Sequence, residues 1–378
     1  MGAPGIEGSS TRVHLRREGA RMTKPTADGL DTAVVAETLI SDVDGERGRL
    51  VIAGHDVEEL AASASFEVAA SRVLSAGAGE DRTIELGDAL GRARAAAWEH
   101  VPRLGDALAH ADGMDALKAG LAHLRATGDD VADAVAALGA APVFVAGWSR
   151  ARAGQQPIAP DPASGHAADY LRMTVGTQPR PDAVAALDAY LVTVIDHAMS
   201  ASTFTARVIA STASDLLSAV MGAVGALKGP LHGGAPGPVL DMLDAIGTPD
   251  RAEAWLMGEL AAGRRIMGMG HRVYRVRDPR AAVLEIAVRP LASPHLELAR
   301  AVEAAAAKIL RERKPDRPLA ANVEFYTAVL LDAVGLPREQ FSSTFAVSRI
   351  AGWSAHVLEQ RRIGRLIRPA SRYVGRMP

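Results

Sequence analysis

The chain has 378 residues, of which 48% are hydrophobic and 23% charged, so it is long enough to bury a sizeable core in one large domain or two. The formal net charge of −2 provides no overall basic field for nucleic acid or an anionic membrane, although 42 Lys and Arg residues are available for local anion sites. Cysteine is absent, which excludes disulfides, thiolate catalysis and cysteine-ligated zinc.

The N-terminal stretch is polar and rich in glycine, and we expect residues 1–28 to form a disordered extension. Met1–Arg21 has no apolar segment of the kind found in secretory signals, and Glu7 and Glu18 argue against a mitochondrial transit peptide. We also expect no apolar run that approaches the ~18 residues of a membrane-spanning helix. By default, the sequence therefore predicts a cytoplasmic protein that binds neither nucleic acid nor membrane.

Alanine-rich segments with apolar residues every three or four positions follow, and they predict a mainly α-helical protein. Short strands are expected only near Glu37–Ile52, around a turn at Asp44-Gly45. Helices are expected over Asp182–Met199, Ser211–Lys228, Pro238–Ile246, Arg251–Ala262, His295–Arg313 and Arg338–Gln360. Gly229-Pro230 should end the helix before it, since glycine caps a helix and proline cannot continue one. Gln155–Pro162 is expected to be a surface loop or a domain boundary.

The first candidate binding residue is His197, in the segment Ile195–Arg207 (IDHAMSASTFTAR). Ser202-Thr203 should cap a new helix that starts at Phe204, which places His197 at a break between two helices. Binding residues often gather at such breaks, but a lone histidine there is more often a structural one.

The second candidate is His232, in the segment GPLHGGA at 229–235. The flanking glycines allow close approach of a ligand, and a helix should begin shortly afterwards. The helix dipole would keep the imidazole neutral, so that it could donate a hydrogen bond to a carbonyl or an enolate. A turn whose histidine only satisfies backbone groups explains the same pattern.

The third candidate pair is His271 and Arg280, in the segment Ile266–Arg280. Gly268-Met-Gly270 offers backbone N–H groups in a tight turn, but the third glycine of a dinucleotide-binding motif is missing. A histidine and an arginine that converge on one anion would suit a substrate with a carboxylate beside a ketone. The alternative is an ordinary loop before a helix, with solvated arginines.

The remaining candidates are Glu324, in the segment ANVEFY at 321–326, and the arginines Arg349 and Arg368. A carboxylate among apolar residues has a raised pKa and can act as a general base, although a glutamate in the first turn of a helix also complements the dipole. The arginines could bind carboxylates bidentately or form surface ion pairs. The eleven histidines are scattered and no metal-binding motif is present, so we expect no metal site and no cofactor.

These segments together resemble the citrate synthase family, which includes the 2-methylcitrate synthases. The resemblance runs from about Gly29 to Gly375 and rests on six motifs in the family's order: SDVDGERGRL (41–50), DHAMSASTFTARV (196–208), GPLHGGA (229–235), MGHRVYRVRDPRA (269–281), NVEFY (322–326) and SRIAGWSAHVLEQ (348–360). The resemblance implies a helical homodimer with a large domain (29–231 and 329–378), a small domain (232–328) and an active site in the cleft between them.

The resemblance also implies a role for each candidate. Glu324 would take a proton from the α-carbon of an acyl-CoA, His232 would hydrogen-bond the thioester oxygen, and His271 would polarise the ketone of oxaloacetate. The dicarboxylate would be held by His197, Arg280 and Arg349, with Arg368 supplied by the other subunit. Coenzyme A would lie against Ile266, Met267, Gly268, Met269 and Gly270, with Arg264 and Arg265 as weaker candidates for its phosphates.

The implied reaction condenses acetyl-CoA with oxaloacetate to give citrate and CoA, and no metal or redox cofactor is required. Three alternatives stay open: a 2-methylcitrate synthase that uses propionyl-CoA, a non-catalytic homologue that binds dicarboxylate or CoA, and an enzyme that cleaves citryl-CoA-type substrates. Three departures from the family bear on this choice. Glu324 stands where the family usually has aspartate, Pro236-Gly237-Pro238 replaces the usual Asn-Glu after GPLHGGA, and AGHDVEEL (53–60) lacks the usual Arg-Gly-Tyr.

Overall fold

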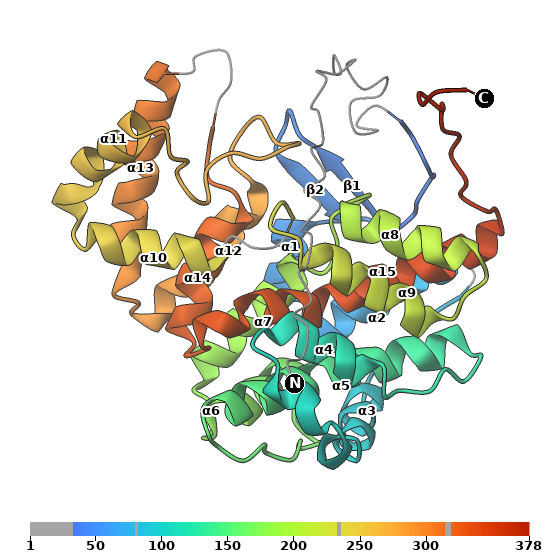
Figure 1. Ribbon diagram of the computed structural model, residues 1–378. Coiled ribbons are helices and arrows are strands. Elements are labelled where there is room, and N and C mark those ends of the chain that lie inside the picture. Colours follow the sequence, from blue (N-terminus) through green and yellow to red (C-terminus); the bar gives the residue numbers. More distant parts are fainter. Residues whose placement is uncertain (1–32, 80–81, 233–235, 314–318, 378) are drawn as a thin grey trace, which may run out of the picture. The chain divides into compact units, whose positions relative to one another are not determined.

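A computed structural model of the chain describes residues 33–79, 82–232, 236–313 and 319–377 (Figure 1). The expected extension 1–28 lies outside these residues. The compact fold is formed by the described residues from Thr38 onward.

The strands lie where the sequence predicts them. A small antiparallel sheet contains β1 (Ser41–Asp44), β2 (Arg49–Ile52) and β3 (His55–Asp56), in that order. Asp44 pairs with Arg49 across the predicted turn, so that Leu50 and Ile52 face the core.

Helices make up most of the rest, as expected. They are α1 (Val57–Ser63), α2 (Phe66–Ala78), α3 (Ala89–Trp98), α4 (Gly113–Leu121), α5 (Asp130–Arg152), α6 (His166–Val175), α7 (Pro181–Thr193), α8 (Ala201–Ser211), α9 (Leu216–Leu227), α10 (Pro236–Ile246), α11 (Ala252–Ala261), α12 (Pro279–Val288), α13 (His295–Arg313), α14 (Val323–Ala333) and α15 (Phe341–Ile363). Short 3-10 turns occur at Val101–Arg103, Gly105–Ala109, Pro249–Arg251, Arg289–Leu291 and Arg338–Gln340.

Local capping chemistry explains where many of these helices begin. Side chains that accept a hydrogen bond from a backbone N–H of the first turn occur at Ser65, Asp112, Asp129, Ser200, Asp215, Asp278 and Asn322. The prediction that Ser202-Thr203 caps a helix starting at Phe204 is wrong, because Ser200 is the cap and α8 begins at Ala201. The helix expected over Asp182–Met199 ends early, at Thr193, and a turn follows it.

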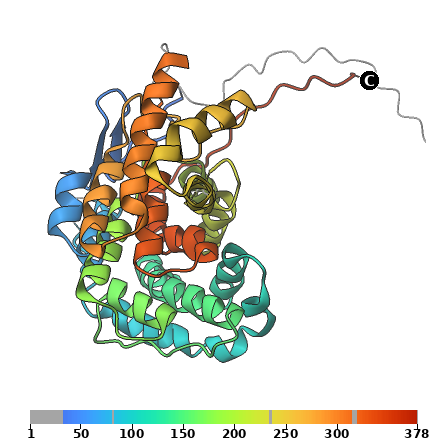
Figure 2. The same ribbon diagram turned by 90° about the vertical axis from the view of Figure 1, so that its left-hand side faces the viewer.

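Helix α15 lies at the centre of the packing, in contact with α2, α5, α8 and α9 (Figures 1 and 2). Glycine lets the backbone of α15 approach two neighbouring segments unusually closely, α2 and the turn after α7. A Cβ on Gly77 of α2 would lie 2.3 Å from the carbonyl oxygen of Ala355, and a Cβ on Gly352 of α15 would lie 2.5 Å from that of Ile195. These glycines therefore allow the backbones to pack closely.

A second group of helices contains α10, α11, α13 and α14, with α12 packed between α14 and α7 (Figure 1). These elements cover much of the segment 232–328 that was expected to be the small domain. The division at 232 and 328 stays a prediction, as does the homodimer.

Helix α5 differs from one expectation. It is long and apolar enough, by length and composition, to cross a membrane, whereas we expected no such run; 78% of its apolar window is buried inside the fold. Every residue of α5 from Ala137 to Ser149 is buried. Burial of this kind is typical of a core helix.

Candidate active site

The loop Ile266–Gly270 is fixed against the start of α14. Met269 forms a bridge with Ala321, the N–H of Gly270 donates to the carbonyl of Ala320 (2.7 Å), and the N–H of Asn322 donates to the carbonyl of Gly268 (2.9 Å). Gly268 and Gly270 both have positive φ, +71° and +89°. The predicted tight turn is confirmed, and its pairing brings His271 beside the N-terminus of α14.

Replacement of Gly268 by Ala should destabilise this loop. The new Cβ would lie 2.9 Å from Cδ2 of Phe325 and 3.0 Å from Cγ2 of Val239, in a backbone conformation that favours glycine. We expect a loss of roughly 1–3 kcal/mol in the free energy of unfolding, measured by denaturant titration. Gly258→Ala is the matched control, because a Cβ there, in α11, meets no atom within 4 Å and should stabilise the helix slightly. Equal stabilities of the two variants would contradict the packing argument.

His271 follows this loop as a neutral hydrogen-bond donor. Its Nδ1 accepts from the backbone N–H of Val273 (3.0 Å) and of Tyr274 (3.1 Å), so the ring proton lies on Nε2. Burial, with a further contribution from Arg280, lowers the pKa of His271 to about 4. At neutral pH the ring can therefore donate from Nε2 without carrying a charge.

Arg280 is held by a bidentate ion pair at the start of α12. Its Nε and Nη2 donate to the two carboxylate oxygens of Asp278, at 3.0 and 2.7 Å, and both residues are buried. Asp278 also caps α12 and accepts from the N–H of Val323 in α14 (3.2 Å). One carboxylate thus joins the N-termini of both helices and orients the guanidinium.

Glu324 lies in the first turn of α14 and has a buried oxygen without a partner. Its backbone N–H donates to the side chain of the capping residue Asn322 (3.0 Å), while Oε2 has no hydrogen-bond partner among the described residues. Burial raises the pKa of Glu324 to about 7, although the guanidinium groups of Arg280 and Arg349 act in the opposite direction. A carboxyl group in this state can accept a proton near neutral pH.

His197 and Tyr274 complete the face around His271. Nε2 of His197 lies 3.2 Å from the hydroxyl of Tyr274, and the ring centroids of His197 and His271 are 5.4 Å apart. The centroids of His271 and Tyr274 are 4.7 Å apart, and the guanidinium of Arg280 lies 5.9 Å from the Tyr274 ring. Burial, with the nearby cation Arg280 and the neighbouring His271, lowers the pKa of His197 well below its usual value.

Arg349 links this face to His232. It is buried in α15, and its Nε donates to the carbonyl of Val194 (2.6 Å). Burial lowers the pKa of Arg349 to about 10. The charge of the same guanidinium contributes to the lowered pKa values of His197 and His232 and acts against the raised pKa of Glu324.

His232 presents Nδ1 as its donor. Nε2 lies 2.8 Å from the hydroxyl of Ser202 and accepts from the Ser202 N–H (3.3 Å), which leaves the ring proton on Nδ1. The Ser202 hydroxyl in turn accepts from the indole of Trp353 (3.1 Å). Burial lowers the pKa of His232 to about 4, with a further contribution from Arg349. Desolvation is therefore the first cause of the neutral state of His232, whereas we expected the helix dipole to be the cause.

Three predicted residues are not brought into this cluster. Arg368 is exposed in residues 364–377, which follow α15 without regular secondary structure. The N–H of Ile367 still donates to Ser211 in α8 (3.1 Å), and the chain then runs away from the helices towards its C-terminal end (Figures 1 and 2). Arg264 is exposed and pairs with Glu259, and Arg265 is exposed beside it.

Several residues in the cluster were not predicted as functional. Ser202 was taken for a helix cap, and Tyr274 and Asp278 were assigned no role. The contacts of Ser202 with His232 and of Tyr274 with His197 join separate elements, so spacing along the chain could not reveal them. The sequence Asp-Pro-Arg did carry a signal for Asp278, since aspartate before proline is a typical helix start.

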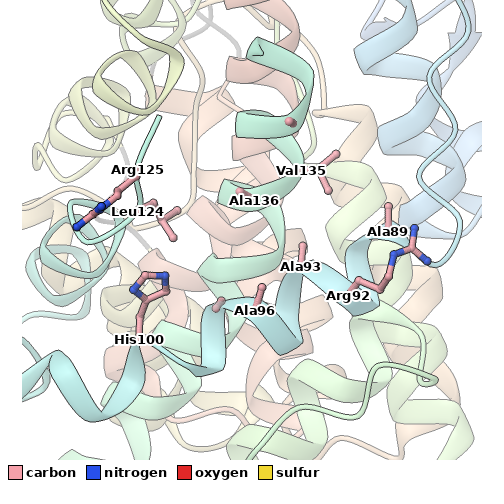
Figure 3. Close-up of a pocket in the computed structure, with 11 residues that line it drawn as sticks. Ala89, Arg92, Ala93, Ala96, His100, Leu124, Arg125, Val135 and Ala136 are labelled. Carbon is pink, nitrogen blue, oxygen red and sulfur yellow. The ribbon is translucent and has the colours of Figure 1, made fainter. Parts of the chain in front are cut away.

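Two surface pockets lie away from this cluster. One of about 620 Å³ runs between α3 and α5, with an alanine floor and the side chains of Arg92, His100 and Arg125 around it (Figure 3). A second, of about 750 Å³, follows α2. Neither contains a candidate site residue. Among the described residues, no group of three or more His, Asp or Glu side chains is placed to hold a metal ion.

The candidate site of this mainly helical fold combines three neutral histidines, two buried arginines and one carboxyl group. Such a site is suited to acid–base chemistry on a carbonyl substrate that carries carboxylates. Residues 29–370 match the family model "Citrate synthase, C-terminal domain". The chain belongs to the citrate synthase family.

Individual relatives agree with this assignment. A relative from Mycobacterium tuberculosis is 51% identical over 201 residues, and the chain spans about half (54%) of its length. The 2-methylcitrate synthase of M. tuberculosis is 34% identical over 94% of this chain and 93% of its own. The ternary complex of Thermoplasma acidophilum citrate synthase with carboxymethyl coenzyme A and oxaloacetate is 26% identical, with a TM-score of 0.82, over 94% of this chain and 98% of that one.

Proposed function

We propose that the protein condenses acetyl-CoA with oxaloacetate to give citrate and CoA, with Glu324 as the base. The observation that carries this proposal is the state of Glu324: its Oε2 is buried and finds no hydrogen-bond partner in the described part of the chain, and burial raises its pKa to about 7. A buried carboxyl oxygen without a hydrogen-bond partner has little structural use, but it suits proton transfer from a weak carbon acid.

The two neutral histidines supply what the carboxylate alone lacks. The α-proton of a thioester is very weakly acidic, so the developing enolate needs hydrogen-bond donors. His232 would donate from Nδ1 to the thioester oxygen while Glu324 removes the proton. His271 would donate from Nε2 to the ketone oxygen of oxaloacetate as the enolate carbon attacks, and would protonate the resulting alkoxide. Hydrolysis of the citryl thioester then releases CoA and citrate.

The dicarboxylate would be bound by His197, Arg280 and Arg349. Asp278 already neutralises much of the charge of Arg280, because the pair is bidentate and buried. Two carboxylates therefore require a further cation, and we propose that Arg368 of a second subunit supplies it, since this exposed residue lies outside the cluster of its own chain. The backbone of Ile266–Gly270 would contact coenzyme A.

Propionyl-CoA is the second candidate substrate, favoured by the likeness to a 2-methylcitrate synthase. The two thioesters differ by one methylene, which is worth only about 1–3 kcal/mol of discrimination in an apolar pocket. Release of CoA thiol from each thioester, with oxaloacetate present, tests both proposals. Turnover with acetyl-CoA at the higher kcat/KM supports the first, and the reverse order supports the second. Release from neither thioester would overturn both and favour a binding role.

The pH profile should report the ionisation of Glu324. The base must be deprotonated, so at saturating oxaloacetate the kcat/KM for acetyl-CoA should be constant above the pKa and fall about tenfold per pH unit below about pH 7. Bound dicarboxylate adds negative charge and can only move this limb upward. The histidines, with pKa values of about 4, should add no limb above about pH 5. A flat profile from pH 5.5 to 8 would contradict the assignment of the base.

A further inference from the structure

A short turn between α7 and α8 carries two groups of the candidate site. His197 lies within it, and Ser202, which orients His232, lies in the first turn of α8 just beyond it. Ala198 has φ of +48°, a left-handed conformation that is unfavourable for a residue other than glycine. Such a conformation persists only where surrounding contacts determine it.

Helix α15 supports one side of this turn. Arg349 donates from Nε to the carbonyl of Val194, and Gly352 allows the turn to lie directly on the helix. A Cβ on Gly352 would come within 2.5 Å of the Ile195 carbonyl oxygen, and it would also collide with the carboxylate of Asp196.

The other side is held by Asp196, which is fully buried. Its Oδ2 accepts from the hydroxyl of Ser41 in β1 and from the N–H of Ala198 (3.1 Å), the residue with positive φ. Its carboxylate also lies 3.3 Å from Nε2 of His356 in α15. The side chain of Asp196 therefore bonds directly to the strained peptide that follows His197.

His356 is itself held in one orientation. Its Nδ1 accepts from Nε of Arg207 (3.0 Å), so the ring proton lies on Nε2 and faces Asp196. Arg207 also pairs with Glu359 and donates to Gln360 (3.1 Å). All of these side chains are buried, and none belongs to the cluster that would contact substrate.

A buried ionic group of this kind is weak as a stabilising device. The cost of removing the charges from water offsets most of their mutual attraction, and apolar side chains of similar size often do as well. The contacts of the ionic group meet the turn on both sides of His197. They therefore suit the group to hold the His197 ring in place.

We propose that Asp196 and His356 are positioning residues, which hold the strained turn so that His197 faces the bound 2-oxo dicarboxylate and thereby set the affinity for it. This inference rests on the proposed function of the same site. Neither residue touches the substrate; both act through His197.

Asp196→Asn is the direct test. The amide keeps the shape but loses the charge and the second acceptor, and we expect the KM for oxaloacetate to rise about 10–100-fold. The KM for acetyl-CoA at saturating oxaloacetate should change less than about threefold. His356→Ala should show the same selective effect, and His356→Gln should restore most of the affinity, because its amide can accept from Arg207 and donate to Asp196.

Asp169→Asn is the matched control. Asp169 is as buried as Asp196 and forms an ion pair with Arg94 (2.8 Å), but it lies in α6 and contacts none of the candidate site residues. This variant should lower Tm and leave the KM for oxaloacetate within about twofold. The proposal is overturned if Asp196→Asn lowers Tm in the same way without a change in that KM.

Two further outcomes also decide the proposal. If Asp196→Asn does not fold, Ser41→Ala is the second variant: it removes the hydroxyl that donates to the carboxylate and accepts from the N–H of Ala198 (2.9 Å). An unchanged KM for oxaloacetate would then overturn the proposal. If the wild-type protein releases no CoA, the proposed function fails, and the positioning role is judged by calorimetric titration with oxaloacetate. Equal Kd values for wild type and Asp196→Asn would overturn it independently.

Discussion

Replacement of Glu324 by Gln should lower kcat for CoA release by about 10²–10⁴-fold, because the amide cannot accept the α-proton. The KM and the calorimetric Kd for oxaloacetate should stay close to the wild-type values, since the dicarboxylate would be bound by the arginines and His197. Glu297→Gln is the control: this exposed glutamate occupies the first turn of α13 and should have no effect. Unchanged turnover of Glu324→Gln would remove Glu324 from the mechanism.

The same substitution should make the protein more stable at alkaline pH. The folded-state pKa of about 7 exceeds the ordinary value of 4.5, so the folded wild type loses stability as the pH rises through that window. At about 1.4 kcal/mol per pH unit, Glu324→Gln should gain on the order of 3 kcal/mol at pH 8 and nothing below about pH 4.5. Urea titrations at both pH values measure the difference.

Replacement of His271 by Ala should lower kcat/KM for oxaloacetate by about 10²–10³-fold, the usual effect of losing one donor to a developing oxyanion. Two backbone N–H groups fix its ring so that Nε2 donates, and the ring lies against Tyr274, with the centroids 4.7 Å apart. His123→Ala is the control, because that histidine is exposed and bonds only to the carbonyl of Ala119. A loss below tenfold for His271→Ala would show that the ketone is polarised by another group.

Local patterns predicted the helices whose ends have strong chemical signals. His295–Arg313 was predicted at both ends, and the strands around Asp44-Gly45 were predicted from their β-branched residues and turn. The start of α8 was missed because three hydroxyl residues, Ser200, Ser202 and Thr203, lie within four positions, and only the backbone conformation decides which of them caps.

The candidate site could be predicted as a set of residues but not as an arrangement. The order of the motifs indicated His232, His271 and Glu324. In the folded chain His232 contacts Ser202 of α8, Glu324 lies in α14, and His271 lies in the loop before α12. The sequence predicted a neutral His232 from the helix dipole. In the structure, the first cause of its lowered pKa is burial, which depends on packing between distant segments. The ionic group behind His197 was missed for the same reason, because Arg207 and His356 are 149 positions apart.

The hydrogen bond from the Trp353 indole to Ser202 gives the protein an internal optical reporter. The indole is fully buried and lies one hydroxyl away from the ring of His232. Indole emission responds to the electric field and the hydrogen bond at its nitrogen, both of which depend here on the charge and orientation of one imidazole. We therefore expect binding at the candidate site to change the emission of a fluorophore that the chain already contains, without a label or an inserted residue.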